Sequence, residues 1–120
     1  MAFSIIPKEL WKGFCETVGK YSQGNLIEIE VASLDVGDQI EETWIQFTGL
    51  SYDKSKELIH VNTLNDEHMI SRPRSIVIDE DGPNIKSITI KDTNSQLHII
   101  LFRRPLMLPS PVRSQAEMQD

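Results

Sequence analysis

The run Leu26-Ile27-Glu28-Ile29-Glu30-Val31 decides the fold class of this 120-residue chain. Its aliphatic residues alternate with two glutamates, which is the pattern of a strand with one buried and one solvated face. The same period of two continues beyond this run for about eighty residues, interrupted only by short turn sequences. The pattern therefore predicts a mainly β domain.

Further strands are predicted in five segments, each bounded by turn-forming residues. They cover residues 42–52, 58–63, 75–79, 85–91 and 97–102, and residues 68–71 are expected to be a short extended piece. Gly49 lies inside the first of these and predicts a bulge or a sharp bend. The last is apolar at nearly every position, which predicts a central strand covered on both faces. Connections of about 3–6 residues are too short for parallel crossovers, so sequential strands should pair as antiparallel hairpins.

The segment before Gly24 has a helical period instead. Apolar side chains recur on one stripe: Leu10, Trp11, Phe14, Val18 and Tyr21. Pro7 suits the first turn of such a helix, where its missing N–H is not needed. We therefore expect an N-terminal helix followed by an antiparallel meander of about six strands. Such a meander would form either an open SH3-like or Sm-like barrel or a strongly twisted sheet.

Two boundaries are predicted from composition and length. Residues 1–108 are expected to form a single helix-capped domain, because about 110 residues can bury a sufficient core without a metal or a disulfide. Pro109–Asp120 holds two prolines, little apolar bulk and no periodicity. These last residues are predicted to be a disordered tail.

Charge is unevenly distributed along the chain. Eighteen acidic and twelve basic residues give a net charge of −6, yet residues 21–53 contain no Lys or Arg. Seven carboxylates lie in that block: Glu28, Glu30, Asp35, Asp38, Glu41, Glu42 and Asp53. An acidic domain is a poor candidate for nonspecific nucleic-acid binding, which depends on Lys and Arg. The block is either a solvated strand face or a docking surface for a basic partner.

The termini and the cysteine content predict a cytoplasmic protein. The first residues lack the basic and long apolar regions of a secretory signal. No stretch approaches the roughly 18 apolar residues that would cross a bilayer, so no membrane association is expected. The single cysteine, Cys15, cannot form an intramolecular disulfide, which fits a reducing compartment.

Searches for catalytic, metal-binding and cofactor-binding motifs give no site. His60, His68 and His98 lack the close spacing of zinc ligands and are interpreted as structural. Cys15 lies on the apolar helix stripe with no obvious His partner, so it is expected to be inert. No glycine-rich phosphate loop is present. We therefore predict no catalytic residue, no metal and no cofactor, and a protein that is not an enzyme.

Two arginine pairs are weaker candidates for a binding site. Arg72 and Arg74 flank Pro73, and Arg103 with Arg104 precede Pro105. If the strands brought them together, four guanidinium groups would recognise a carboxylate or phosphate. They could equally cover the edge of the sheet and pair with acidic strands.

Two further features are noted. Asp53 and His68 could serve a hydrolase or isomerase if they met in a cleft. The apolar segment Pro105–Pro109 could pack on the core or form an interaction or dimer contact.

Several short landmarks resemble a known family. They are Ile6-Pro7-Lys8-Glu9-Leu10-Trp11 with Phe14 and Gly24, Val31, Asp35-Val36-Gly37-Asp38-Gln39, Leu50-Ser51-Tyr52-Asp53, His68-Met69-Ile70, Pro73 and Phe102-Arg103-Arg104-Pro105-Leu106. Together they make residues 5–109 similar to a domain-of-unknown-function family of small bacterial proteins. The resemblance implies a bacterial cytoplasmic protein made of this one domain, and it implies no activity.

The leading hypothesis from the sequence is a non-enzymatic interaction module that binds a protein partner or itself. It rests on the absent catalytic motifs, the segregated charge and the apolar Pro105–Pro109 segment. The alternative is an Sm-like nucleic-acid or nucleotide/anion binder that uses Arg72, Arg74, Arg103 and Arg104.

Overall fold

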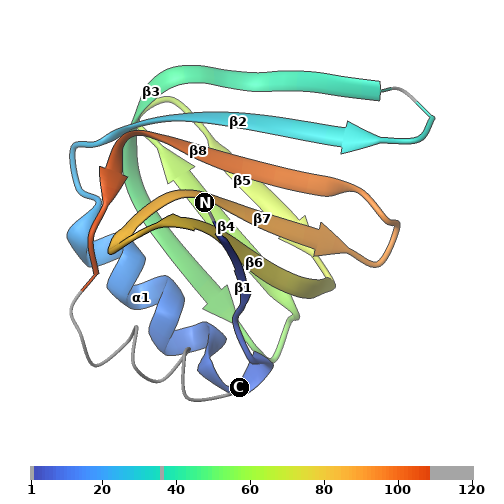
Figure 1. Cartoon of the computed structure of the whole chain (residues 1–120). Helices are drawn as coiled ribbons and strands as arrows, with labels where there is room; N and C mark the ends of the chain where they lie inside the picture. Colours follow the sequence, from blue (N-terminus) through green and yellow to red (C-terminus); the bar gives the residue numbers. More distant parts are fainter. Residues whose placement is uncertain (1, 36, 109–120) are drawn as a thin grey trace.

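The computed structural model describes residues 2–35 and 37–108. Within them one α-helix and one short 3-10 helix accompany eight strands (Figure 1). The elements are β1 (Ala2–Ile5), η1 (Lys8–Leu10), α1 (Trp11–Tyr21), β2 (Leu26–Ser33), β3 (Gly37–Asp53), β4 (Leu58–Thr63), β5 (Glu67–Ser71), β6 (Pro73–Asp81), β7 (Asn84–Asp92) and β8 (Leu97–Leu106). The predicted mainly β class with an N-terminal helix is confirmed, and the predicted tail, residues 109–120, lies outside the described residues.

All eight strands belong to one antiparallel sheet with the order β1-β6-β7-β8-β2-β3-β4-β5. The prediction of about six strands was too low, and the SH3-like barrel was imprecise. Since β1 pairs with β6 alone and β5 with β4 alone, the sheet keeps two edges and does not close. It consists of two meanders, β2–β5 and β6–β8, joined where β8 returns to pair with β2.

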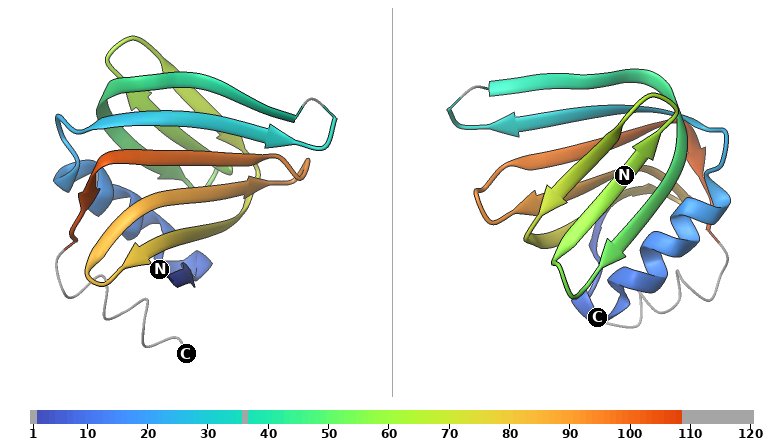
Figure 2. Two further views of the ribbon diagram at one scale, coloured as in Figure 1. Left: turned by 45° about the horizontal axis from the view of Figure 1, so that its top comes forward. Right: turned by 180° about the vertical axis from the view of Figure 1, so that it is seen from behind.

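The long strand β3 belongs to both halves of the curved sheet. Its first half, residues 37–46, pairs with β2, and its second half, residues 47–53, pairs with β4. The register shifts between Phe47 and Gly49, so the irregularity predicted at Gly49 is confirmed. At this point β3 leaves the first set of strands and crosses the other side of the core (Figure 2).

The helix α1 packs along the second half of β3 and closes one end of the core (Figure 2). Trp11 is its main anchor, with its ring edge-on to Tyr52 at 5.3 Å between centroids and its Nε1 donating to the Ile6 carbonyl at 2.9 Å. Gly19 allows close approach, because a Cβ there would lie 3.2 Å from the backbone nitrogen and oxygen of Leu50. The helix therefore depends on tertiary packing rather than on its own propensity.

Three expectations need refinement. β8 is central in the sheet as predicted, but its burial alternates, so one face is buried and the other only partly covered. In the apolar segment that begins at Pro105, Leu106 and Leu108 are buried in the core while Met107 is exposed. The strand β1 was not predicted, because its four residues gain their pairing only from the distant β6.

Candidate functional site

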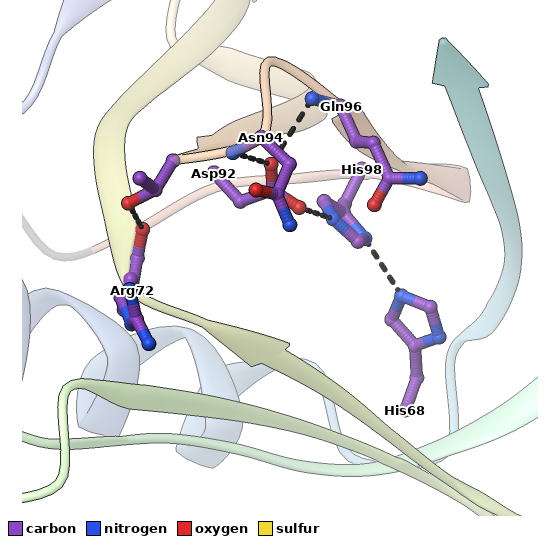
Figure 3. A network of polar contacts seen from close by, with 7 residues as sticks. His68, Arg72, Asp92, Asn94, Gln96 and His98 are labelled. Carbon is purple, nitrogen blue, oxygen red and sulfur yellow. Dashed lines mark hydrogen bonds and ion pairs between the residues drawn. The ribbon is translucent and has the colours of Figure 1, made fainter. Parts of the chain in front are cut away.

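A polar network connects the two halves of the sheet inside the fold (Figure 3). His68, on edge strand β5, lies with Nε2 2.9 Å from Nδ1 of His98 on β8. His98 Nε2 in turn lies 2.8 Å from Oδ2 of Asp92 at the end of β7. The side chains of His98 and Asp92 are only 7% and 8% exposed, so this pair is almost removed from water.

The local sequence explains the contact between Asp92 and His98. Asp92 begins the turn between β7 and β8, and its Oδ1 accepts hydrogen bonds from the backbone N–H groups of Asn94 and Gln96. Ile90 pairs with His98, and Asp92 shares the face of Ile90, so Asp92 and His98 lie beside one another next to the turn of the hairpin. The contact with His68 is long-range and depends on the curvature that brings β5 over β8.

The positions of the protons in the network follow when Asp92 is taken as ionised and both imidazoles as neutral. An ionised Asp92 can only accept, so His98 donates from Nε2, and Nδ1 of a neutral His98 then accepts from His68 Nε2. In this arrangement Nδ1 of His68 is the site at which the network takes up a further proton. The network can thus act chemically as a single proton acceptor held by a buried carboxylate.

The surroundings shift the pKa of two of these groups, His68 and Asp92. Burial, followed by the proximity of His98, lowers the pKa of His68, although Glu41 and Asp66 oppose this shift. Burial acts to raise the pKa of Asp92, but hydrogen bonds from His98, Gln96 and Asn94 outweigh it and leave that pKa below its ordinary value. Near neutral pH these shifts favour a neutral His68 and an ionised Asp92.

The network has no metal-binding character in the described part of the chain, where no group of three or more His, Cys, Asp or Glu side chains is arranged to hold an ion. Both ring nitrogens of His98 are already occupied. Cys15 is fully buried, and desolvation raises the pKa of its thiol to about 12. A protonated, buried thiol does not act as a nucleophile.

Asp53 and His68 are not brought together. His68 pairs with Val61, which pairs with the buried Leu50, so His68 lies on the face of the strands that is directed toward the core. Asp53 pairs with Leu58, and both lie on the opposite face of the same strands. Asp53 instead accepts hydrogen bonds within its own turn from Ser55 and Lys56. The hydrolase or isomerase site imagined from these two residues is wrong in its geometry.

The four arginines also remain in two separate pairs. Arg72 and Arg74 lie where Pro73 pairs with Asp92, and Arg103 and Arg104 lie near the other end of β7, where Ile85 pairs with Leu106. Seven residues of strand separate these ends, which corresponds to roughly 20 Å. Arg103 lies over the Trp44 ring, 5.2 Å from its centroid. A single four-arginine site does not exist in this fold.

Residues 28–42 of the acidic block identified in the sequence belong to a projecting hairpin, whereas Asp53 lies at the other end of β3, where it pairs with Leu58 of β4. The far parts of β2 and β3 extend beyond the rest of the sheet (Figures 1 and 2). One face of this hairpin carries Glu28, Glu30, Asp38 and Ile40, because Glu30 pairs with Ile40 and alternate residues share a face. We call these four residues the acidic hairpin face.

Like charges are held close together on the acidic hairpin face. A hydrogen bond with Asp38, together with burial and the charges of Asp38 and Glu28, raises the pKa of Glu30. None of these carboxylates forms an ion pair with a described Lys or Arg. Ile40 is 52% exposed among them, and Leu34 at the hairpin tip is fully exposed. The face therefore combines uncompensated negative charge with exposed apolar surface.

Comparison with known proteins gives a family and names no activity. An uncharacterised protein of Aquifex aeolicus (strain VF5) is 27% identical over 110 residues, covering 91% of this chain and 99% of its own length. No solved structure matches the chain significantly. The model of a family of unknown function, DUF5335, matches residues 3–111. The chain belongs to this family, and the resemblance seen in the sequence is confirmed.

Proposed function

We propose that this chain is a protein-interaction module and that its acidic hairpin face binds a basic partner protein. The observation that carries the proposal is the cluster of Glu28, Glu30 and Asp38 around exposed Ile40, with no described cation pairing with it. Holding like charges together costs free energy in the isolated chain. A basic partner would relieve that repulsion on binding.

The shape of the hairpin supports a partner other than a second copy. Residues 37–46 of β3 pair on one side only, with β2, so their other edge is open among the described residues. The register of this hairpin is irregular at two points, and Trp44 has a positive φ of 46°. Bulges and charges on an edge oppose pairing with another strand, and two copies would repel one another. Recognition would therefore use side chains of the face rather than strand addition.

The exposed apolar side chains give the face a second kind of contact. Interfaces are generally held by a few central apolar residues within a polar rim. Ile40 lies directly opposite Glu30 and is the natural centre of this arrangement. Charge would set the class of partner and the rate of association, and Ile40 would contribute to the lifetime of the complex.

The experiment compares two variants with the same change in net charge. Wild-type chain, Glu28→Gln/Glu30→Gln/Asp38→Asn and the control Glu9→Gln/Glu16→Gln/Glu57→Gln are used to capture proteins from native lysate. Captured proteins are identified by mass spectrometry, purified and titrated against each chain. We expect a basic partner whose Kd rises at least tenfold for the hairpin variant and changes little for the control. Equal affinity for all three chains, or no captured protein, would refute the proposal.

A further inference from the structure

A hollow of about 420 Å³ lies where β6 begins beside the turn between β7 and β8. It is lined by Arg74, Ser75, Lys91, Asp92, Thr93 and Ser95. Its size falls within the range of small-molecule sites, which hold ligands of metabolite size. The hollow is separate from the acidic hairpin face and does not depend on the function proposed above.

Two cations, Arg74 and Lys91, and the hydroxyl groups of Ser75 and Ser95 line this hollow. Lys91 pairs with Ser75 across the β6–β7 ladder, so both side chains lie on the same face of the sheet. Arg74 lies at the register shift between Pro73 and Ser75, and its side chain is exposed. Neither Arg74 nor Lys91 forms an ion pair with a carboxylate in the described part of the chain. Their charges are therefore available to a ligand.

The one carboxylate in the lining is already committed to protein donors. Asp92 Oδ1 accepts from the N–H groups of Asn94 and Gln96, and Oδ2 lies against His98. Oδ2 is directed toward His98, as Figure 3 shows. These same bonds hold the turn that carries Thr93 and Ser95.

Hydrogen bonds to the protein also hold Thr93 and Ser95, which line the hollow. Thr93 donates from both its backbone N–H, at 3.1 Å, and its hydroxyl, at 2.9 Å, to the carbonyl oxygen of Arg72 (Figure 3). Ser95 donates its N–H to the Asp92 carbonyl at 3.1 Å. A site whose donors are fixed before binding loses little conformational freedom when a ligand enters.

We propose that this hollow binds the phosphoryl group of a small phosphate monoester. A guanidinium group offers a planar pair of donors that matches phosphate oxygens, and an ammonium group adds a second positive charge. Serine hydroxyl groups, here those of Ser75 and Ser95, complete such sites by donating to the remaining oxygens. The pairing of one Arg and one Lys with two hydroxyls favours a compact dianion over a carboxylate or an extended polyanion.

The experiment follows backbone amide resonances in ¹H–¹⁵N spectra while inorganic phosphate, ribose 5-phosphate or ribose is added at constant ionic strength. We expect saturable shifts at residues 74–75 and 91–95 with both phosphates and none with ribose. Arg74→Gln/Lys91→Gln should raise the Kd for ribose 5-phosphate at least tenfold. The control Arg103→Gln/Arg104→Gln removes the same charge at the other end of β7 and should leave that Kd unchanged.

Three outcomes would overturn the proposal. They are the absence of saturable shifts with ribose 5-phosphate, equal loss of affinity in both double variants, and shifts confined to the separate groove lined by Lys12, Tyr52 and Lys54. Chloride at the same ionic strength is the reference for general screening. A circular dichroism spectrum of each variant establishes that it is folded before titration.

Discussion

Replacing His98 with alanine should destabilise the fold far more than replacing the more exposed His60. In the native chain both nitrogens of His98 are engaged, by His68 and by Asp92. The substitution would leave Asp92 Oδ2 without that partner in a site where the carboxylate is only 8% exposed. It would also remove a contact that joins β5 to β8.

The magnitude follows from the burial of the pair. Removing one partner of a buried ionic or charge-assisted hydrogen bond typically costs about 3–5 kcal/mol. That is a large part of the roughly 5–15 kcal/mol that stabilises an ordinary domain. With a urea dependence of about 2 kcal/mol per molar, the unfolding midpoint should fall by about 2 M. Asp92→Asn, which keeps the shape and the acceptor oxygen, should cost less, about 1–3 kcal/mol.

Urea unfolding followed by tryptophan fluorescence gives the measurement. The matched control is His60→Ala, because His60 also contacts a carboxylate, Glu67 at 2.9 Å, but with side chains 24% and 51% exposed. Such a pair contributes about 0–1 kcal/mol. If His98→Ala and His60→Ala lower the midpoint equally, the network has no special role in holding the sheet together.

Three further predictions concern stability and reactivity. The pKa of His68 is lower in the folded chain than its ordinary value of 6.5, so the folded chain binds fewer protons than the unfolded chain as pH falls below about 6.5. The free energy of unfolding should therefore decrease on acidification from about pH 7.5 to pH 5.5. Urea titrations of His68→Asn should show a smaller decrease over the same pH range. An equal decrease in wild type and variant would contradict the lowered pKa of His68. Gly13→Ala should raise the free energy of unfolding by about 0.5–1 kcal/mol, because a Cβ there meets nothing within 4 Å. Gly19→Ala should lower it by about 1–3 kcal/mol, since its Cβ would press on the Leu50 backbone, and thermal melts of the two variants should move in opposite directions. Cys15 should react with a thiol reagent only in denaturant, and rapid labelling of the native chain would show that its burial is not maintained.

Most helices and strands could be predicted from the sequence because each is marked by the residues within it. Alternation identified the strand at Ile27 and Ile29, and the apolar stripe with Pro7 identified the helix that the structure has as η1 and α1. Gly49 marked the irregularity in β3. By contrast, β1 exists only because Ala2–Ile5 pairs with a strand about seventy residues away, and no local pattern contains that information.

The candidate sites were predictable only in part, for the same reason. The strands predicted at residues 85–91 and 97–102 imply a turn that holds Asp92 and places His98 nearby, but the third member, His68, comes from another part of the sheet. The four arginines were grouped by their places near predicted strand ends, and Asp53 with His68 as a candidate polar site in a cleft. Strand order and face then separated them, and neither can be read from spacing along the chain. Of the seven carboxylates in the acidic block, Glu28, Glu30 and Asp38 share one face of a hairpin, because they lie close in sequence, whereas Asp53 lies at the far end of β3.

Hydrogen–deuterium exchange of the chain with and without its basic partner tests the central claim most directly. The first half of β3, residues 37–46, and its neighbour β2 carry the acidic hairpin face. The account predicts that slowed exchange on binding is concentrated in the peptides that cover these residues. Protection confined to β1, α1 or β5, with exchange in the hairpin unchanged, would contradict it.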